Sequence, residues 1–164
     1  MNKKAGIFIV LLVVATLALP VSVASATKPE TKTLIGTFGT PFDPSKVTII
    51  TAGDSGNAAW KFRDAPVVWT GEMSAASGVY NGNWLTKGGL LGQGGETALT
   101  TGTYALTDVT IDGIGTGDLT LGQNGGHLFV KSGSGDLTSI RGTGTITAAG
   151  MFTYNYELEI QINQ

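Results

Sequence analysis

The sequence predicts an all-β domain: an antiparallel β-barrel of roughly eight strands, with a two-sheet β-sandwich as the alternative. Three observations lead to this prediction. Residues 151–162 alternate between apolar and polar side chains without a break. About eight or nine short β-like segments are separated by turn residues, and no segment has the period of an amphipathic helix. The connections resemble hairpins, which favours an up-and-down order of strands. A closed barrel would also leave no exposed sheet edge.

The final segment carries the clearest signal in the chain. One face collects Phe152, Tyr154, Tyr156, Leu158, Ile160 and Ile162, and the other collects Met151, Thr153, Asn155, Glu157, Glu159 and Gln161. Because successive side chains of a strand point to opposite faces, the first set is predicted to be buried and the second to face solvent. Such a strand needs partners from earlier in the chain.

The first 26 residues read as a secretory signal peptide. A short basic start at Lys3 and Lys4 precedes the apolar stretch 7–19, and Ala24-Ser25-Ala26 provides the small residues of a cleavage site. We therefore predict a signal peptide over residues 1–26 and one β-barrel domain over residues 27–164, secreted or at the cell surface. The stretch is too short for a membrane span.

Charge and cysteine content narrow the function classes. Removing Lys3 and Lys4 leaves eight basic and twelve acidic residues, a net charge of −4 for the 138 residues that follow the signal. This charge argues against nucleic acid or an anionic membrane as a partner after signal cleavage. The chain has no cysteine, which excludes disulfides, a thiolate nucleophile and cysteine metal ligands. We expect no metal and no cofactor, and the sequence does not define the oligomeric state.

Before the final strand, the chain divides into short elements. Residues 27–32 form a loose leader, and 39–44 and 52–57 are turns with Gly, Pro or Asp. Residues 67–73 and 79–85 are predicted to pair as a hairpin through 75–78, and 87–96 form a Gly-rich loop. The alternation changes phase near Thr107 and Asp108, which indicates a β-bulge. Ser134 or Asp136 is positioned to cap a helical turn within residues 135–140. The other predicted strands are 34–38, 47–51, 59–62, 103–111, 117–121, 127–131 and 141–147.

One motif suggests a family. Residues 132–144 read Ser-Gly-Ser-Gly-Asp-Leu-Thr-Ser-Ile-Arg-Gly-Thr-Gly. A segment of this type before the last strands resembles the allene oxide cyclase and dirigent barrel-like superfamily, and is similar to small secreted prokaryotic β-barrel proteins of unknown function. The resemblance covers roughly residues 67–162 and implies an antiparallel, roughly eight-stranded barrel. Dirigent proteins use Asp, Arg and Tyr residues in their pocket, and Arg141 of this chain lies in the shared motif. The carboxylate, Asn and Cys of the plant cyclases have no match in this sequence.

The aromatic residues are the main candidates for a ligand site. Trp69, Trp84, Tyr80 and Tyr104 have the size and chemistry to line an apolar pocket or stack against a sugar, and Arg141 joins them through the resemblance. The alternative is an ordinary barrel core, which the alternation of Trp69 with Val67 and Met73 favours for Trp69. Trp84 stands beside the Gly-rich loop, where a pocket mouth is more open.

Other polar residues give weaker signals. His127 is the only histidine, but no Ser or Asp near it has the spacing of a triad, and it is predicted to lie on the surface. Four aspartates, at positions 108, 112, 118 and 136, could hold calcium, but no EF-hand or repeat is present, and turn capping is the favoured interpretation.

These observations support three function hypotheses. The first is a secreted, non-catalytic barrel that binds a small apolar or amphipathic ligand. The second is a cofactor-free isomerase or cyclase, which requires a pocket-facing ionisable group. The third is a surface or filament subunit that pairs through a free strand at residues 33–38.

Overall fold

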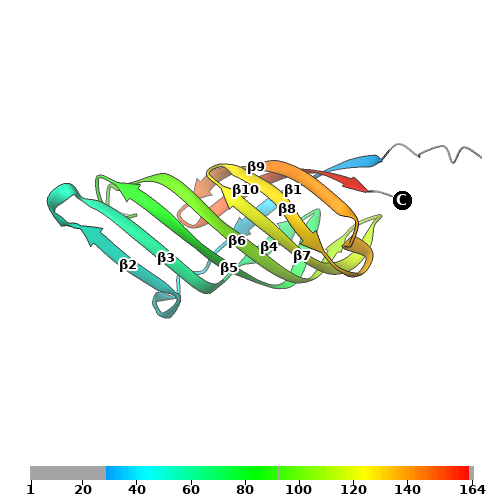
Figure 1. Cartoon of the computed structure of the whole chain (residues 1–164), viewed down its shortest axis with the longest axis horizontal. Helices are drawn as coiled ribbons and strands as arrows, with labels where there is room; N and C mark the ends of the chain where they lie inside the picture. The colour runs from blue at the N-terminus through cyan, green and yellow to red at the C-terminus, as the bar shows by residue number, and fades with distance from the viewer. Residues whose placement is uncertain (1–28, 92, 163–164) are drawn as a thin grey trace, which may run out of the picture.

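The computed structural model describes residues 29–91 and 93–162, so the predicted signal peptide lies outside the described residues. The described chain forms one antiparallel sheet with three short 3₁₀ turns (Figure 1). The strands are β1 (Glu30–Gly39), β2 (Val47–Ala52), β3 (Asn57–Pro66), β4 (Val68–Gly71), β5 (Met73–Lys87), β6 (Glu96–Ile111), β7 (Gly115–Asn124), β8 (His127–Gly133), β9 (Ile140–Gly150) and β10 (Thr153–Ile162). The 3₁₀ turns are η1 (Pro44–Lys46), η2 (Gly53–Ser55) and η3 (Gly135–Leu137).

The hydrogen-bonded order is β2-β3-β5-β6-β7-β8-β9-β10-β1-β4. The six strands from β5 to β10 follow one another as a meander, and β1 returns to pair with both β10 and β4. The ladder itself is open. However, β3 and β4 are separated only by Val67, whose N–H donates to the Gly78 carbonyl of β5 at 2.9 Å. The continuous segment of β3, Val67 and β4 thus pairs with β5 through β3 and with β1 through β4.

The sheet curls around a single core. Trp69 of β4 meets Tyr104 of β6 edge to face at 5.4 Å between ring centroids, although the two strands are not neighbours in the ladder. Trp84 of β5 and Tyr154 of β10 meet in the same way at 6.0 Å. The predicted all-β, antiparallel fold is confirmed, in a barrel-like form with an open ladder. It has more strands than the eight predicted for a barrel.

The final strand has the predicted two faces. Leu158 and Ile160 are completely buried, whereas Glu157 and Glu159 are exposed. Across the ladder, Leu158 lies opposite Leu34 of β1 and Gly144 of β9. The strand at residues 34–38 is also confirmed, but it begins earlier: residues 30–32, predicted as a loose leader, are already paired with β10.

The predicted hairpin between residues 67–73 and 79–85 is wrong. The connection at 75–78 lies inside β5, which pairs with β3 on one side and β6 on the other. The chain turns instead at Gly71, whose φ of 105° suits glycine. A side chain there would also meet the Ile35 carbonyl oxygen at 2.5 Å. The Gly at 78 looked like a turn signal but serves close packing within a strand.

Two smaller predictions are confirmed in position. The register of β6 against β7 shifts between Leu106 and Val109, and Asp108 sits in this bulge at φ 49°. The helical turn exists as η3, but its predicted capping is wrong. Ser134 makes no side-chain cap there. Its hydroxyl oxygen instead accepts from the Asp118 N–H at 2.9 Å, and the Asp136 carboxylate accepts from the Thr116 N–H at 3.0 Å.

Candidate functional site

Aromatic rings fill the half of the interior that opens at the β9–β10 turn. They pack as neighbours from five strands, with Phe38 stacked on Trp69 at 4.3 Å between centroids and Tyr80 against Tyr104 at 4.7 Å. Phe62 and Trp84 are 4.5 Å apart. This continuous cluster forms because every second residue of these strands points inward.

Glycine makes room for the ring of Tyr80. Gly82 and Gly102 face each other across β5 and β6, on the same face as Tyr80. A Cβ at Gly82 would come within 2.2 Å of the Tyr80 hydroxyl, and one at Gly102 within 2.4 Å of its ring. The ring therefore lies flat over two residues that have no side chain. Its hydroxyl donates to the Thr101 carbonyl and accepts from the Trp84 indole N–H, each at 3.0 Å.

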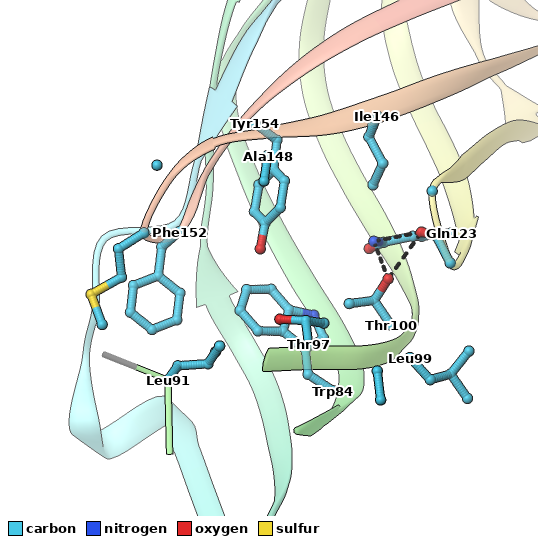
Figure 2. A pocket seen from close by; sticks show the side chains of 15 residues that line it. Trp84, Leu91, Thr97, Leu99, Thr100, Gln123, Ile146, Ala148, Phe152 and Tyr154 are labelled. Atoms are coloured by element: carbon cyan, nitrogen blue, oxygen red, sulfur yellow. Dashed lines mark hydrogen bonds between the residues drawn. The ribbon is translucent and has the colours of Figure 1, made fainter. Parts of the chain in front are cut away.

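A second set of polar residues forms a hydrogen-bond network beside this aromatic cluster. The Tyr104 hydroxyl donates to Gln123 Oε1 at 2.7 Å, and Gln123 Nε2 donates to Thr100 Oγ1 at 2.8 Å and to the Gly125 carbonyl at 3.2 Å. The Thr100 hydroxyl also donates to the Gly125 carbonyl (Figure 2). Both amide hydrogens of Gln123 are used, so this network orients its members and has little capacity left for a ligand.

A pocket of about 440 Å³ opens above these residues. Figure 2 shows Trp84 at its base, Phe152 and Leu91 on one side, and Thr100, Gln123 and Ile146 on the other. The hydroxyl of Tyr154 points into the space toward Trp84, and no hydrogen bond to it is found among the described residues. The pocket is thus mostly apolar, and the unpaired hydroxyl of Tyr154 is aimed into it.

Phe152, in the pocket wall, has an unusual backbone conformation. It lies in the turn between β9 and β10 with φ 58°, a region that large side chains rarely adopt. Its ring stacks on Trp84 and on Phe42, at 5.6 Å in both cases. Its carbonyl accepts from the Thr40 N–H at 3.0 Å. Strained residues of this kind persist where surrounding contacts over-determine them, and they are concentrated at functional sites.

The tyrosines around the pocket are neutral donors near neutral pH. Burial raises the pKa of Tyr154 to about 12. Burial also raises the pKa of Tyr80 and that of Tyr104 well above their usual value. The low polarity of the interior disfavours the phenolate, so these hydroxyls keep their protons and can donate hydrogen bonds.

The structure brings together four of the five predicted site residues. Trp84 lines the pocket, and Trp69, Tyr80 and Tyr104 lie buried in the aromatic cluster beneath it. Arg141 lies apart, exposed at the start of β9. It lines a separate groove of about 810 Å³ on the outer side of β8 and β9, which pair at only three positions. A ligand-binding role for these residues stays a prediction.

Sequence reasoning missed several residues of the pocket. Gln123 continues the alternation of Leu119 and Leu121, and this pattern could have placed it inside. Phe152 and Tyr154 were placed on the inner face but not in a pocket. Leu91 comes from the Gly-rich connection after β5, for which the sequence has no periodic signal.

The ionisable residues do not gather at this site. His127 is exposed, and the buried polar side chains of the described chain other than tyrosine are Thr40, Thr86, Thr100 and Gln123. No carboxylate is buried in the described chain, and the ionisable group that faces the pocket is the phenol of Tyr154. Within residues 29–91 and 93–162, no group of three His, Asp or Glu residues is arranged to hold a metal. No helix in that part is long and apolar enough to cross a membrane.

Two buried donors lack acceptors in the described chain: the indole N–H groups of Trp60 and Trp69. Buried polar groups are nearly always paired, so each such group calls for an explanation. Trp60 packs edge to face against Phe152, with 6.4 Å between ring centroids. One of the two donors therefore belongs to a ring that supports the pocket wall.

Comparison with known proteins shows the fold only. No family model matches the chain, and no curated protein matches its sequence. A solved structure of a protein of unknown function from the DUF3224 family of Shewanella oneidensis MR-1 aligns with a TM-score of 0.50 and 19% identity, covering 80% of this chain and 96% of that one. The pterocarpan synthase dirigent protein GePTS1 aligns with a TM-score of 0.45 and 9% identity, covering 92% and 99%. The first similarity indicates a shared fold.

Proposed function

We propose that the protein binds one small, flat, mostly apolar molecule in the pocket at the β9–β10 turn. The observation that carries this proposal is the unpaired Tyr154 hydroxyl, directed into a pocket of about 440 Å³ with aromatic walls. Ligand pockets commonly measure about 300–1,000 Å³ and combine apolar walls with a few placed polar groups. The strained backbone of Phe152 adds support, because it fixes a ring in the wall.

The chemistry of the walls defines the ligand class. Trp84 and Phe152 stack on each other nearly parallel, with 24° between their planes, and both rings line the pocket as an aromatic wall. Tyr154 is protonated at neutral pH and donates, so the ligand carries an acceptor such as a carbonyl, ether or hydroxyl oxygen. Binding of this kind needs no catalytic group. Export through the segment at residues 1–26 is part of the same proposal, as is membership of the superfamily that the motif at 132–144 resembles.

The proposal is tested by filling the pocket. Ala148 lines the pocket and is exposed, so Ala148→Phe places a ring in the mouth without disturbing the core. Ala149→Phe is the matched control, because this exposed neighbour does not line the pocket. Protein is purified from its native host without denaturation, extracted with solvent and analysed by mass spectrometry. Titration with the fluorescent probe anilinonaphthalene sulfonate, which is flat, apolar and carries acceptor oxygens, measures affinity directly.

We expect a compound that is enriched in wild-type and Ala149→Phe extracts and absent from Ala148→Phe extracts. The affinity for the fluorescent probe should likewise be similar in wild type and Ala149→Phe and lower in Ala148→Phe. Tyr154→Phe keeps the ring and removes the donor, and it should weaken binding by about two- to tenfold, the value of one hydrogen bond. Equal probe affinity in wild type and Ala148→Phe, together with extracts that contain no bound compound, would refute the proposal.

A further inference from the structure

The described sheet ends in two terminal strands, β4 and β2. β4 directly follows Val67, whose N–H donates to β5, whereas β2 pairs with β3 alone within the described chain. It lies at the outer edge of the sheet in Figure 1, away from β1 and β10. An edge strand presents a row of free N–H and C=O groups that can pair with another strand.

This edge lacks the features that normally prevent pairing. Its sequence, Val-Thr-Ile-Ile-Thr-Ala, contains no charge, proline or glycine. Ile49 and Ile50 are 39% and 49% exposed. Natural sheets protect exposed edges with lysine, proline or bulges, and a flat apolar edge without them favours association.

An apolar row leads up to the edge on the outer face. Ile50 lies opposite Ala59, Ala59 opposite Leu85, and Leu85 opposite Leu99, across β2, β3, β5 and β6. Leu85 and Leu99 are 44% and 43% exposed. Polar residues border the row, with Thr48, Lys61, Asn83 and Thr101 on one side and Asn57, Lys87 and Glu96 on the other. Apolar surface with a polar rim is typical of interaction sites.

The charges that flank β2 identify the partner. Lys46 precedes the strand as the last residue of η1, and Asp54 follows it within η2. We propose that β2 pairs, edge to edge and antiparallel, with β2 of a second copy of this chain, about a two-fold axis at Ile50. In this register Ile50 faces its own copy, Thr48 faces Ala52, and Lys46 approaches Asp54 of the second copy, twice.

The alternatives do not match as well. Directly opposed residues of an antiparallel pair lie on the same face of the sheet, and a two-fold axis perpendicular to the sheet leaves each side chain on its own face. The residue at the axis must therefore oppose its own copy, so the axis is centred on one residue of β2 and not between two consecutive residues. Centred on Ile49, the same pairing would set Lys46 against Ala52 and leave Asp54 without a basic partner. Centred on Ile50, it joins opposite charges and also brings the two apolar rows end to end.

Charge reversal tests both the partner and the register. Protein purified from cells that express the full chain is examined by analytical ultracentrifugation over a range of concentrations. Wild type should dimerise. Lys46→Glu and Asp54→Lys should each weaken the dimer by about tenfold or more, because each turns two attractive pairs into two repulsive ones. An equimolar mixture of the two variants should dimerise like wild type, since opposite charges then meet in both pairs.

Lys131→Glu is the matched control, because it makes the same charge change on β8, away from the edge, and should leave the dimer unchanged. Thermal unfolding of each variant confirms that it is folded. Three results would overturn the proposal: a wild-type monomer at every concentration, dimers that the Lys46 and Asp54 variants leave intact, or a mixture no better than its components. Capture of an unrelated peptide by a monomer would likewise exclude a second copy as the occupant.

Discussion

The interior has two parts that differ in chemistry and in packing. An aliphatic end contains Leu34, Met73, Ile111, Leu119, Leu158 and Ile160, all of them at most 1% exposed. An aromatic half contains Phe38, Trp69, Tyr80, Trp84, Tyr104 and Tyr154 and ends in the pocket. Strand β10 runs through both, with Leu158 and Ile160 in one and Tyr154 in the other.

The comparison separates stability from binding. Branched aliphatic side chains fill space densely and have no polar atoms to satisfy. Aromatic residues bring hydroxyl and indole groups, whose hydrogen bonds to Thr101, Gln123 and each other fix the rings but leave a gap at the mouth. The aliphatic end accordingly holds the sheet together, and the aromatic half provides the shape of the proposed ligand site.

The largest effect is expected at the aliphatic end. Leu158→Ala removes a completely buried side chain opposite Leu34 and should lower the free energy of unfolding by about 2–5 kcal/mol. Tyr154→Phe, on the same strand at the mouth, should change it by less than about 1 kcal/mol, because the lost hydroxyl has no protein partner. Urea denaturation of both variants measures the contrast. A Tyr154→Phe variant as unstable as Leu158→Ala would show that the mouth is part of the packed core.

A smaller effect is expected where the aromatic half is packed most tightly. Gly102→Ala places a Cβ within 2.4 Å of the Tyr80 ring and should cost about 1–3 kcal/mol, the usual range for overpacking. Gly126→Ala is the control at the pocket, because its Cβ would meet only the Ile146 carbonyl at 3.4 Å. Thermal unfolding compares the two. If Gly126→Ala lowers the melting temperature more than Gly102→Ala does, the packing around Tyr80 is not tighter than the packing at the pocket, and this assignment is wrong.

The sequence predicted the aliphatic end better than the aromatic half. Strict alternation in residues 151–162 requires a two-faced strand, and the phase change at Thr107 and Asp108 requires an extra residue in the ladder. Both are local patterns. The bulge is confirmed, and the two-faced strand is confirmed from Thr153 onward, because Met151 and Phe152 lie in the turn before it. The pocket depends on contacts between strands far apart in the chain, such as Trp84 with Tyr154, and on the turn at Phe152. No local period encodes which aromatic rings meet, so Trp84 could be assigned to a mouth only from its neighbouring loop.

Alkaline pH should distinguish the two parts of the interior. Burial raises the pKa of Tyr154 to about 12, above the value near 10 of an unfolded tyrosine. The folded state holds the proton more tightly, so this group's contribution to stability is complete below about pH 10 and is lost as the pH rises toward about 12. Tyr154→Phe should therefore lose less stability over this range than wild type, and Leu158→Ala should lose as much. Urea midpoints measured through this range test it, and equal slopes for wild type and Tyr154→Phe would contradict it.

The smallest effect is expected on the outer face of the same strand. Glu157 is exposed, next to the buried Leu158, and lies opposite Ile35 and Thr145. Glu157→Gln keeps the size and shape of the side chain and removes only a charge that water solvates, so it should cost less than about 0.5 kcal/mol. The neighbouring Leu158→Ala should shift the melting temperature clearly, because a small domain has only about 5–15 kcal/mol of stability in total. Comparable shifts for the two substitutions would mean that the two faces of β10 are equivalent, and the distinction between a buried interior and a solvated exterior would fail at this strand.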